Sequence, residues 1–324
     1  MEIPFELVEA KRAVEFAVLA LPGVVGIGLG AREEDGELFD ELAVRILVED
    51  ASQVPDDLPG EIGGVAVCVI ERRYEPCGFP DEARYKDLRG GIKITQPLRG
   101  EGTMGAIVED ASTGELLGLS CYHVVGDVGV SFPDNVWQPT NPPLVAPVPD
   151  TDNLGEVAAV DFPNTPPLPF SPIRVSMTDS AVFHLDVAKK KGRTFSRAIA
   201  GQGLGQPDLI PAIQATADPT VFQQVRKRGF KTGPTNGTVQ PGKVAGLWTT
   251  LNWPTGGPNA YLMEQVEILG KNGKFCDSGD SGSLVLDATE PTALGLLWGA
   301  QGTFGIMSLI SNVEAHLGIS MVWA

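Results

Sequence analysis

The first apolar pattern along the chain has the spacing of a helix. Between Phe5 and Leu21 apolar side chains recur at helical intervals, and Pro22-Gly23 ends the run, which predicts an amphipathic helix. Beyond it the spacing changes to alternation, which predicts strands at 25–29, 42–48 and 65–70. Residues 1–88 are therefore expected to form a small α+β N-terminal domain with a regulatory or adaptor role, and the charged segment 81–89 is expected to be its exit linker.

From Gly90 onward, short apolar runs alternate with turn residues about every ten positions, which is typical of an all-β sandwich or barrel. One hairpin is clear, with strands at 104–109 and 116–120. Further strands are predicted at 180–187, 225–238, 261–269, 282–286, 293–297 and 305–308. The chain closes with a predicted helix, in which Ser311 and Glu314 form a capping box.

Proline is concentrated in one part of this β-rich region. Eleven prolines fall between Phe132 and Pro172. Proline lacks the amide hydrogen that a central strand needs. The sequence therefore predicts a long irregular surface loop there and no central strand.

The composition is that of a folded protein of 324 residues, enough for two or three domains. Its net charge of −17 repels phosphate, so neither nucleic acid nor a membrane is expected as a partner. The apolar stretch 13–30 is broken by Glu15 and Pro22 and fits neither a signal peptide nor a membrane span. The cysteines are too few for a disulfide framework and are expected to be free thiols in the cytoplasm: Cys68, Cys77, Cys121 and Cys276.

The sharpest chemical signal is the sequence Gly279-Asp280-Ser281-Gly282-Ser283, which an apolar strand follows. A serine hydroxyl needs a base to take its proton, and donors to hold the oxyanion that forms when it attacks a carbonyl. The two glycines allow a turn tight enough for the amides of Gly279 and Ser281 to converge on one oxygen.

This motif resembles the active-site sequence of the trypsin/chymotrypsin-like serine peptidases. In that family a histidine lies far upstream and an aspartate lies between it and the serine. The order His123, Asp179, Ser281 matches the family order, and the resemblance covers roughly residues 90–317. It implies a mainly β fold, a chymotrypsin-like double β-barrel. Residues 89–196 would form the first barrel, with the histidine and the aspartate, and 197–324 the second, with the serine and the C-terminal helix.

By this resemblance Ser281 is the nucleophile, His123 the general base and then acid, and Asp179 the group that fixes the imidazole tautomer. Gly279 and Ser281 supply the oxyanion hole. The resemblance also places five residues in substrate binding: Phe275, Ser278, Leu297, Trp298 and Gly299. No acid stands at Phe275, near the base of the specificity pocket, so a small or apolar substrate residue is expected rather than Lys or Arg. Core filling explains Phe275 equally well.

Two features depart from the secreted members of the family. Those members mature by a cleavage that frees an N-terminus to bind the aspartate before the serine, here Asp280, and no activation site is seen in this sequence. The family disulfides are not reproduced either, and whether Cys121 and Cys276 tune the site or fill it stays open. The segments 102–105 and 225–239 and the final Ser283 of the motif resemble the non-secreted bacterial members and the plant narrow-leaf protease group.

Other residues compete for these roles or suggest other sites. His184 and His316 are predicted to be structural, and the alternatives to Asp179 are loop carboxylates: Asp127, Asp161 and Asp186. The glycine-rich segments 26–30 and 201–205 lack the full dinucleotide-binding pattern. The basic cluster is expected to be a solvated strand edge or to partner carboxylates within the molecule: Arg226, Lys227, Arg228 and Lys231. Neither a cofactor nor a metal site is expected.

The sequence thus predicts a serine endopeptidase that hydrolyses peptide bonds through an acyl-enzyme. Its partner is a protein or peptide substrate, and self-association is left open. The alternative is a catalytically silent or latent trypsin-like domain that acts as a protein-binding or regulatory module. In the latent version the N-terminal domain or the proline-rich loop covers the cleft.

Overall fold

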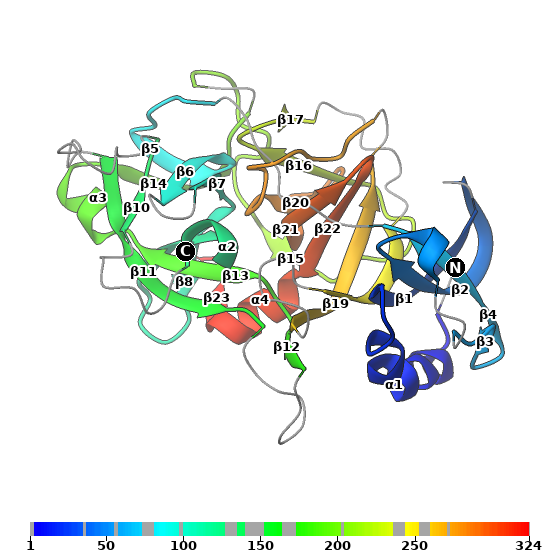
Figure 1. Cartoon of the computed structure of the whole chain (residues 1–324). Coiled ribbons are helices and arrows are strands. Elements are labelled where there is room, and N and C mark those ends of the chain that lie inside the picture. Colours follow the sequence, from blue (N-terminus) through cyan, green and yellow to red (C-terminus); the bar gives the residue numbers. More distant parts are fainter. Residues whose placement is uncertain are drawn as a thin grey trace.

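The computed structural model is mainly β, with 50% of residues in strands and 14% in helices, which confirms the predicted fold class (Figure 1). Two curled sheets lie beside each other. No helix in the part of the chain that the structure describes is long and apolar enough to span a membrane. The structure describes residues 3–34, 37–54, 58–72, 81–96, 100–126, 135–139, 152–163, 173–201, 204–235, 244–252, 260–270 and 273–323.

The first sheet has the strand order β23-β8-β9-β13-β11-β10-β6-β7. Its strands are β6 (Ile92–Gln96), β7 (Gly100–Met104), β8 (Ala106–Asp110), β9 (Leu116–Ser120), β10 (Asn135–Trp137), β11 (Asn153–Asp161), β13 (Ser180–His184) and β23 (Ile319–Ser320). The predicted hairpin is β8–β9, in which Ala106 lies opposite Leu119. Next to this sheet are two short parallel strands and two helices: β5 (Asp87–Gly90), β14 (Thr194–Ile199), α2 (Tyr122–Val125) and α3 (Asp186–Lys190).

One prediction for this sheet is wrong. Strand β11 lies between β13 and β10, so a central strand does cross the proline-rich region. The reason is local: residues 153–161 contain no proline, and the prolines cluster on either side of them. The spacing of the prolines, rather than their number, decides where a strand can form. The flanking segments 140–151 and 164–172 lie outside the described residues.

The second sheet follows the path β17-β16-β20-β21-β22-β19-β18-β1-β2-β4-β3, with β12 beside β19 and β15 beside β21. Its later strands are β12 (Arg174–Ser176), β15 (Ala215–Thr216), β16 (Val225–Gly229), β17 (Gly233–Pro234), β18 (Val244–Asn252), β19 (Ala260–Leu269), β20 (Leu284–Asp287), β21 (Thr292–Gln301) and β22 (Phe304–Leu309). Its N-terminal strands are β1 (Val24–Glu34), β2 (Glu37–Val48), β3 (Glu61–Ile62) and β4 (Val65–Glu71), and the short 3-10 helix Ala51–Gln53 follows β2. Strand β18 and its antiparallel pairing with β1 are not predicted by the sequence pattern.

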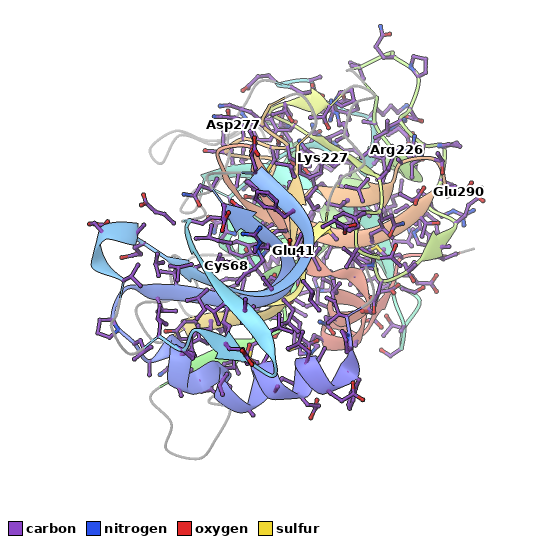
Figure 2. The ribbon with its side chains drawn as sticks, turned by 90° about the vertical axis from the view of Figure 1, so that its right-hand side faces the viewer. Glu41, Cys68, Arg226, Lys227, Asp277 and Glu290 are labelled. Carbon is purple, nitrogen blue, oxygen red and sulfur yellow. The ribbon has the colours of Figure 1, made fainter. Side chains whose placement is uncertain are left out.

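The N-terminal helix α1 (Phe5–Leu19) packs on the N-terminal strands. Its buried side chains, such as Leu7 and Val18, share a core with Ile27 of β1 and with Tyr261 of β19. The Tyr261 hydroxyl also donates a hydrogen bond of 3.0 Å to Leu19 O. In Figure 2 the helix runs beneath the curved N-terminal strands, which carry Glu41 and Cys68. The N-terminal segment therefore shares both a sheet and a core with β19.

Four buried charged side chains join the N-terminal strands to β19. Arg45 and Arg72 each contact both Glu33 and Glu267, with distances of 2.6 Å for Arg45–Glu33, 2.6 Å for Arg72–Glu33 and 2.7 Å for Arg72–Glu267. The Arg72 guanidinium also stacks on the Phe304 ring at 3.7 Å. Burial alone would raise the pKa of Glu267, but Arg45 and Arg72 outweigh burial and hold this pKa below its usual range. We call these four residues the charged square.

The last helix, α4 (Ile310–Leu317), confirms the predicted closing helix, but its predicted capping box is wrong. The N-cap is Leu309, and no side chain caps the helix. Ser311 lies inside the helix, and Glu314 instead accepts the Met321 amide at 2.8 Å. The reason is that β22 runs into α4 without an intervening loop, so a capping serine has no place before the helix.

Candidate active site

Asp179 holds His123 through two contacts. His123 lies in α2, directly after β9, and Asp179 directly precedes β13, which pairs with β9. Asp179 Oδ1 accepts the His123 backbone amide at 3.1 Å, and Asp179 Oδ2 contacts His123 Nδ1. The carboxylate is fully buried, and the imidazole is 14% exposed. Since Nδ1 donates to a carboxylate only when it carries a proton, the neutral ring has its lone pair on Nε2, where a base needs it.

Ser281 lies in a turn that contacts from both sheets hold in place. Gly279 and Gly282 have φ values of 98° and 93°, which a side chain would strain. Thr103 of β7 donates its amide to Ser281 O at 2.8 Å and its hydroxyl to Gly279 O at 2.7 Å. From the other side, the Gly282 amide donates to Leu297 O at 2.8 Å. The position of the serine is thus fixed by β7 and β21 together.

The two sheets meet directly behind Ser281. A side-chain carbon on Gly282 would collide with Thr103 O and with the Ser120 hydroxyl, and Ser120 lies three residues before His123. The Ser281 hydroxyl donates to Trp298 O at 3.1 Å, and Ser281 is 1% exposed. To pass its proton to His123, this hydroxyl must rotate away from Trp298 O.

The amides of Gly279 and Ser281 take no part in the hydrogen bonds that hold the turn. The neighbouring amides of Asp280 and Gly282 are used within the turn and its surroundings, on Asp277 O at 3.1 Å and Leu297 O at 2.8 Å. Among the described residues, neither the Gly279 nor the Ser281 amide has an acceptor. Two amides without an acceptor beside a serine hydroxyl can receive an oxyanion.

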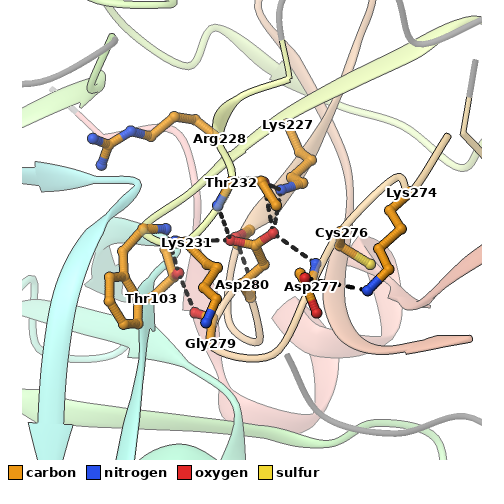
Figure 3. Close-up of polar contacts among 12 residues, drawn as sticks. Thr103, Lys227, Arg228, Lys231, Thr232, Lys274, Cys276, Asp277, Gly279 and Asp280 are labelled. Carbon is orange, nitrogen blue, oxygen red and sulfur yellow. Dashed lines mark hydrogen bonds and ion pairs between the residues drawn. The ribbon is translucent and has the colours of Figure 1, made fainter. Parts of the chain in front are cut away.

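Asp280, next to the serine, is fully buried and accepts five hydrogen bonds (Figure 3). The strongest partner is Lys227 Nζ of β16 at 2.6 Å, which is fully buried as well. Thr232 donates both its hydroxyl, at 2.7 Å, and its amide, at 3.1 Å, and the amides of Lys231 and Asp277 donate at 3.0 and 3.1 Å. Lys227, a residue within the chain, thus supplies the positive charge that Asp280 needs.

The basic cluster behaves as one of its two predicted alternatives. Lys227 pairs with Asp280, and Arg228, also fully buried, pairs with Asp81. These two residues pair with carboxylates within the molecule. The other predicted alternative, a solvated strand edge, is wrong for them because both side chains of β16 are buried. The sequence pattern missed Lys227 as the partner of Asp280. The available signal was a lysine within a strand that begins with a buried valine.

The predicted substrate-binding residues are mostly buried. Phe275 and Leu297 lie in the core cluster of the second sheet, and Phe275 packs where Gly305 leaves room. Trp298 is 2% exposed, and its indole Nε1 donates to Gln265 at 2.7 Å. Ser278 is partly exposed and Gly299 is buried. For the Phe275 side chain the geometry favours core filling, and a substrate role for it stays a prediction.

The competing histidines and aspartates have other partners. His184 lies 2.9 Å from Glu115, and His316 lies 3.2 Å from Asp161, at exposures of 41% and 39%. Asp161 also accepts the Thr178 hydroxyl at 2.7 Å, and Asp186 pairs with Lys190 in α3. Asp127 lies outside the described residues.

Cys121, His123 and Asp179 could offer ligand atoms to a metal ion, because these atoms lie within 4.8 Å of one another. However, the imidazole and the carboxylate already contact each other. Burial, and then the charge of Asp179, raise the pKa of the Cys121 thiol well above its usual value, and a metal binds the thiolate. The three residues are therefore better suited to hold a proton on His123 than to hold a metal. Cys68, Cys121 and Cys276 are free thiols, and Cys77 lies outside the described residues.

Comparison with solved structures gives neighbours among the chymotrypsin-like serine proteases. The chain is similar to Cellulomonas bogoriensis chymotrypsin, with a TM-score of 0.48 and 15% identity over 74% of this chain and 100% of that one. It is also similar to a glutamic acid-specific serine protease that uses a histidine triad in substrate binding, with a TM-score of 0.46 and 15% identity over 72% of this chain and 98% of that one. For Nocardiopsis protease the TM-score is 0.46, with 14% identity over 72% and 97%. No family model matches the sequence, and no curated protein matches it significantly.

Proposed function

We propose that the protein is a serine endopeptidase of the chymotrypsin-like class, with Ser281, His123 and Asp179 as its catalytic triad. The observation that carries the proposal is the double contact of Asp179 with His123. It fixes the imidazole next to the strand end that packs on the Ser281 turn. The contact of Asp179 with His123, and the packing of the Ser281 turn on the strand that leads to His123, support this assignment, and the chain order of the three residues is one that this chemistry uses.

In the proposed reaction the Ser281 hydroxyl rotates from Trp298 O towards His123 Nε2. His123 takes the proton while Oγ attacks the carbonyl carbon of the substrate, and the amides of Gly279 and Ser281 hold the oxyanion. His123 then gives the proton to the leaving amine, and an acyl-enzyme remains. Water attacks this ester with the same base, which regenerates Ser281. Asp179 stays ionised and stabilises the imidazolium.

The Lys227–Asp280 pair supports a peptidase that needs no N-terminal cleavage. Both partners are fully buried, and the lysine belongs to the folded chain itself. The turn before Ser281 is therefore held from the moment the protein folds. This agrees with the proposed placement beside the non-secreted bacterial members of the family, in the cytoplasm.

The test is labelling with a fluorophosphonate probe, followed by turnover of a peptide library. The wild-type protein should be labelled, and Ser281→Ala and His123→Ala should each lower turnover by about four to six orders of magnitude, because the triad acts as a unit. The matched controls are Ser112→Ala, in an exposed turn, and His184→Ala, which is 41% exposed. Both controls should keep wild-type rates.

One observation favours the second candidate, a silent or latent domain that binds proteins. The Ser281 hydroxyl is held by Trp298 O, and the residue is 1% exposed. A folded wild-type protein that resists the probe at every pH tried, and cleaves no peptide in the library, would overturn the peptidase proposal and support the binding module.

A further inference from the structure

We propose that Gln265 is a positioning residue that holds the two halves of the catalytic site against each other, and that helix α1 fixes Gln265 through Arg12 and Glu264. The inference rests on the proposed peptidase function and adds a residue to its machinery. Gln265 lies in β19 and touches neither the nucleophile nor the base directly.

The side-chain amide of Gln265 is fully buried and uses every hydrogen-bonding group that it has. Its Oε1 accepts from the indole of Trp298 at 2.7 Å and from the Ser308 hydroxyl at 2.9 Å. Its Nε2 donates to Met177 O at 2.8 Å and to Met263 O at 2.6 Å. Two acceptor and two donor contacts leave this amide a single orientation.

Two of these partners, Met177 and Trp298, lie in segments next to the catalytic groups. Met177 lies two residues before Asp179, in the segment that leads into β13 of the first sheet. Trp298 belongs to β21 of the second sheet, and its carbonyl accepts the Ser281 hydroxyl. The side-chain amide of Gln265 therefore connects the segment that carries Asp179 to strand β21, whose Trp298 carbonyl contacts Ser281. A shift of Gln265 would move Asp179 and Trp298 relative to each other.

The backbone next to Gln265 is strained. Glu264 has a φ of 58°, in the left-handed region that non-glycine residues seldom adopt. The register between β18 and β19 also shifts here, between the pairs Thr249–Gln265 and Leu251–Leu262. Such a conformation persists only where the surroundings hold it.

Helix α1 supplies that hold. Arg12 Nη2 donates to Glu264 Oε1 at 2.7 Å, and Glu264 is 17% exposed while Arg12 is 45% exposed. Three residues earlier in β19, the Tyr261 hydroxyl donates to Leu19 O at the end of the same helix. The N-terminal helix thus contacts β19 at Tyr261 and Glu264, just before Gln265. The position of the Gln265 side-chain amide depends on the position of this strand.

The alternative is that Gln265 has only a structural role, like any other buried side-chain amide whose hydrogen bonds are all formed. Gln138 offers the matched comparison, because it is also fully buried, donates to Ala83 O at 2.7 Å and accepts from Arg193 at 2.7 Å. Its partners lie outside the segments that carry Asp179 and Ser281. If Gln265 has only a structural role, replacing Gln265 and replacing Gln138 should reduce activity equally. If Gln265 positions the catalytic groups, only its replacement should reduce activity.

The first experiment compares Gln265→Met with Gln138→Met in the full chain, at equal concentrations of folded protein. For Gln265→Met we expect kcat and the fluorophosphonate labelling rate to fall about 100-fold with KM changed little, as a misplacement of about 1 Å does. For Gln138→Met we expect both rates to stay near wild type. Equal losses of kcat and of labelling in the two variants would reject the positioning role.

The second experiment tests α1 at the protein surface, where folding is not at risk. Arg12→Gln should slow labelling about threefold to tenfold, and Arg12→Lys should restore most of the rate, because it keeps a charge for Glu264. The control is Glu9→Gln, which removes another partner of Arg12, at 3.1 Å, and leaves Glu264 in place. A wild-type rate in Arg12→Gln would remove α1 from the inference. A wild-type chain that is not labelled at all would instead overturn the proposed function itself, so the two failures are distinguishable.

Discussion

Asp280 carries a negative charge in a place without solvent, and the residues around it are arranged to compensate that charge. Transfer of a carboxylate into a protein interior costs several kcal/mol unless a partner charge and hydrogen bonds offset the cost. Lys227 supplies the charge, and Thr232 with three backbone amides supplies the hydrogen bonds. The turn that holds Ser281 therefore depends on a lysine more than fifty positions upstream.

Replacing Lys227 by methionine should lower the free energy of unfolding by about 3–5 kcal/mol, because it leaves a buried carboxylate without its partner charge. Urea unfolding measures this loss. The control is Lys274→Met, whose pair with Asp277 is exposed at 60% and 43%, and which should cost less than about 1 kcal/mol. Similar losses in both variants would show that the buried pair contributes no more than a surface pair.

Replacing Asp179 by asparagine should lower kcat about 10⁴-fold while the protein stays folded. The asparagine amide donates to Nδ1 where the carboxylate accepted, so the ring proton moves to Nε2 and the base atom is lost. Asp186→Asn, in the exposed pair with Lys190, is the control and should keep the wild-type rate. An Asp179→Asn enzyme with unchanged peptide turnover would contradict the triad.

Among the secondary-structure elements, β19 contacts both the N-terminal segment and the candidate active site. Tyr261 packs in the N-terminal core, Gln265 binds the segments of Asp179 and Trp298, and Glu267 completes the charged square. Gln265 and Glu267 are two residues apart, so a regular strand places them on the same face. This strand thus joins the interior of the N-terminal segment to the candidate active site.

The charged square predicts acid sensitivity. Because the pKa of Glu267 in the folded protein lies below its ordinary value of 4.5, its contribution to stability is complete above that value and is lost as the pH falls through the lower one. Unfolding free energies measured between pH 6 and about pH 3 should therefore decrease towards acid. The decrease should be smaller in Glu267→Gln, whereas Glu34→Gln, 61% exposed, should follow the wild type. Parallel curves for Glu267→Gln and wild type would contradict this.

Sequence reasoning reached the elements and residues whose signals are local. The helix at the N-terminus, the β8–β9 hairpin and the ordered positions of His123, Asp179 and Ser281 can all be read from short stretches. It missed β11, where proline density hid a strand free of proline. Gln265 was out of reach as well, since its partners lie 33 and 43 positions later and 88 positions earlier along the chain. Contacts of this length leave no pattern in a single sequence.

For the whole molecule, the notable feature is that the second sheet continues into the N-terminal strands. Strand β18 has β19 on one side and β1 on the other. Without residues 3–72, β18 would present an unpaired edge, and Glu267 would lose both arginines of the charged square. An open edge of this kind pairs with other chains.

A chain that begins at residue 81 should accordingly associate or precipitate at concentrations where the full chain stays dispersed. Size-exclusion chromatography with light scattering compares the two. A truncated chain that elutes as a folded monomer would show that β18 tolerates an open edge. Only if the truncated chain is a folded monomer would its peptidase rate show whether the N-terminal segment regulates the site.

The charged square and the C-terminal segment also concern the order in which the chain is made. Arg45 pairs with Glu267, which is synthesised 222 residues later. The Trp323 indole donates a hydrogen bond to Ile107 O, which lies 216 residues earlier in the chain. A ribosome adds roughly 5–20 residues per second, so β2 and β8 remain without these partners for many seconds during synthesis. Neither sheet can be completed before nearly the whole chain has left the ribosome. A nascent chain should therefore complete its candidate active site only at the end of translation, when all of its strands are already paired.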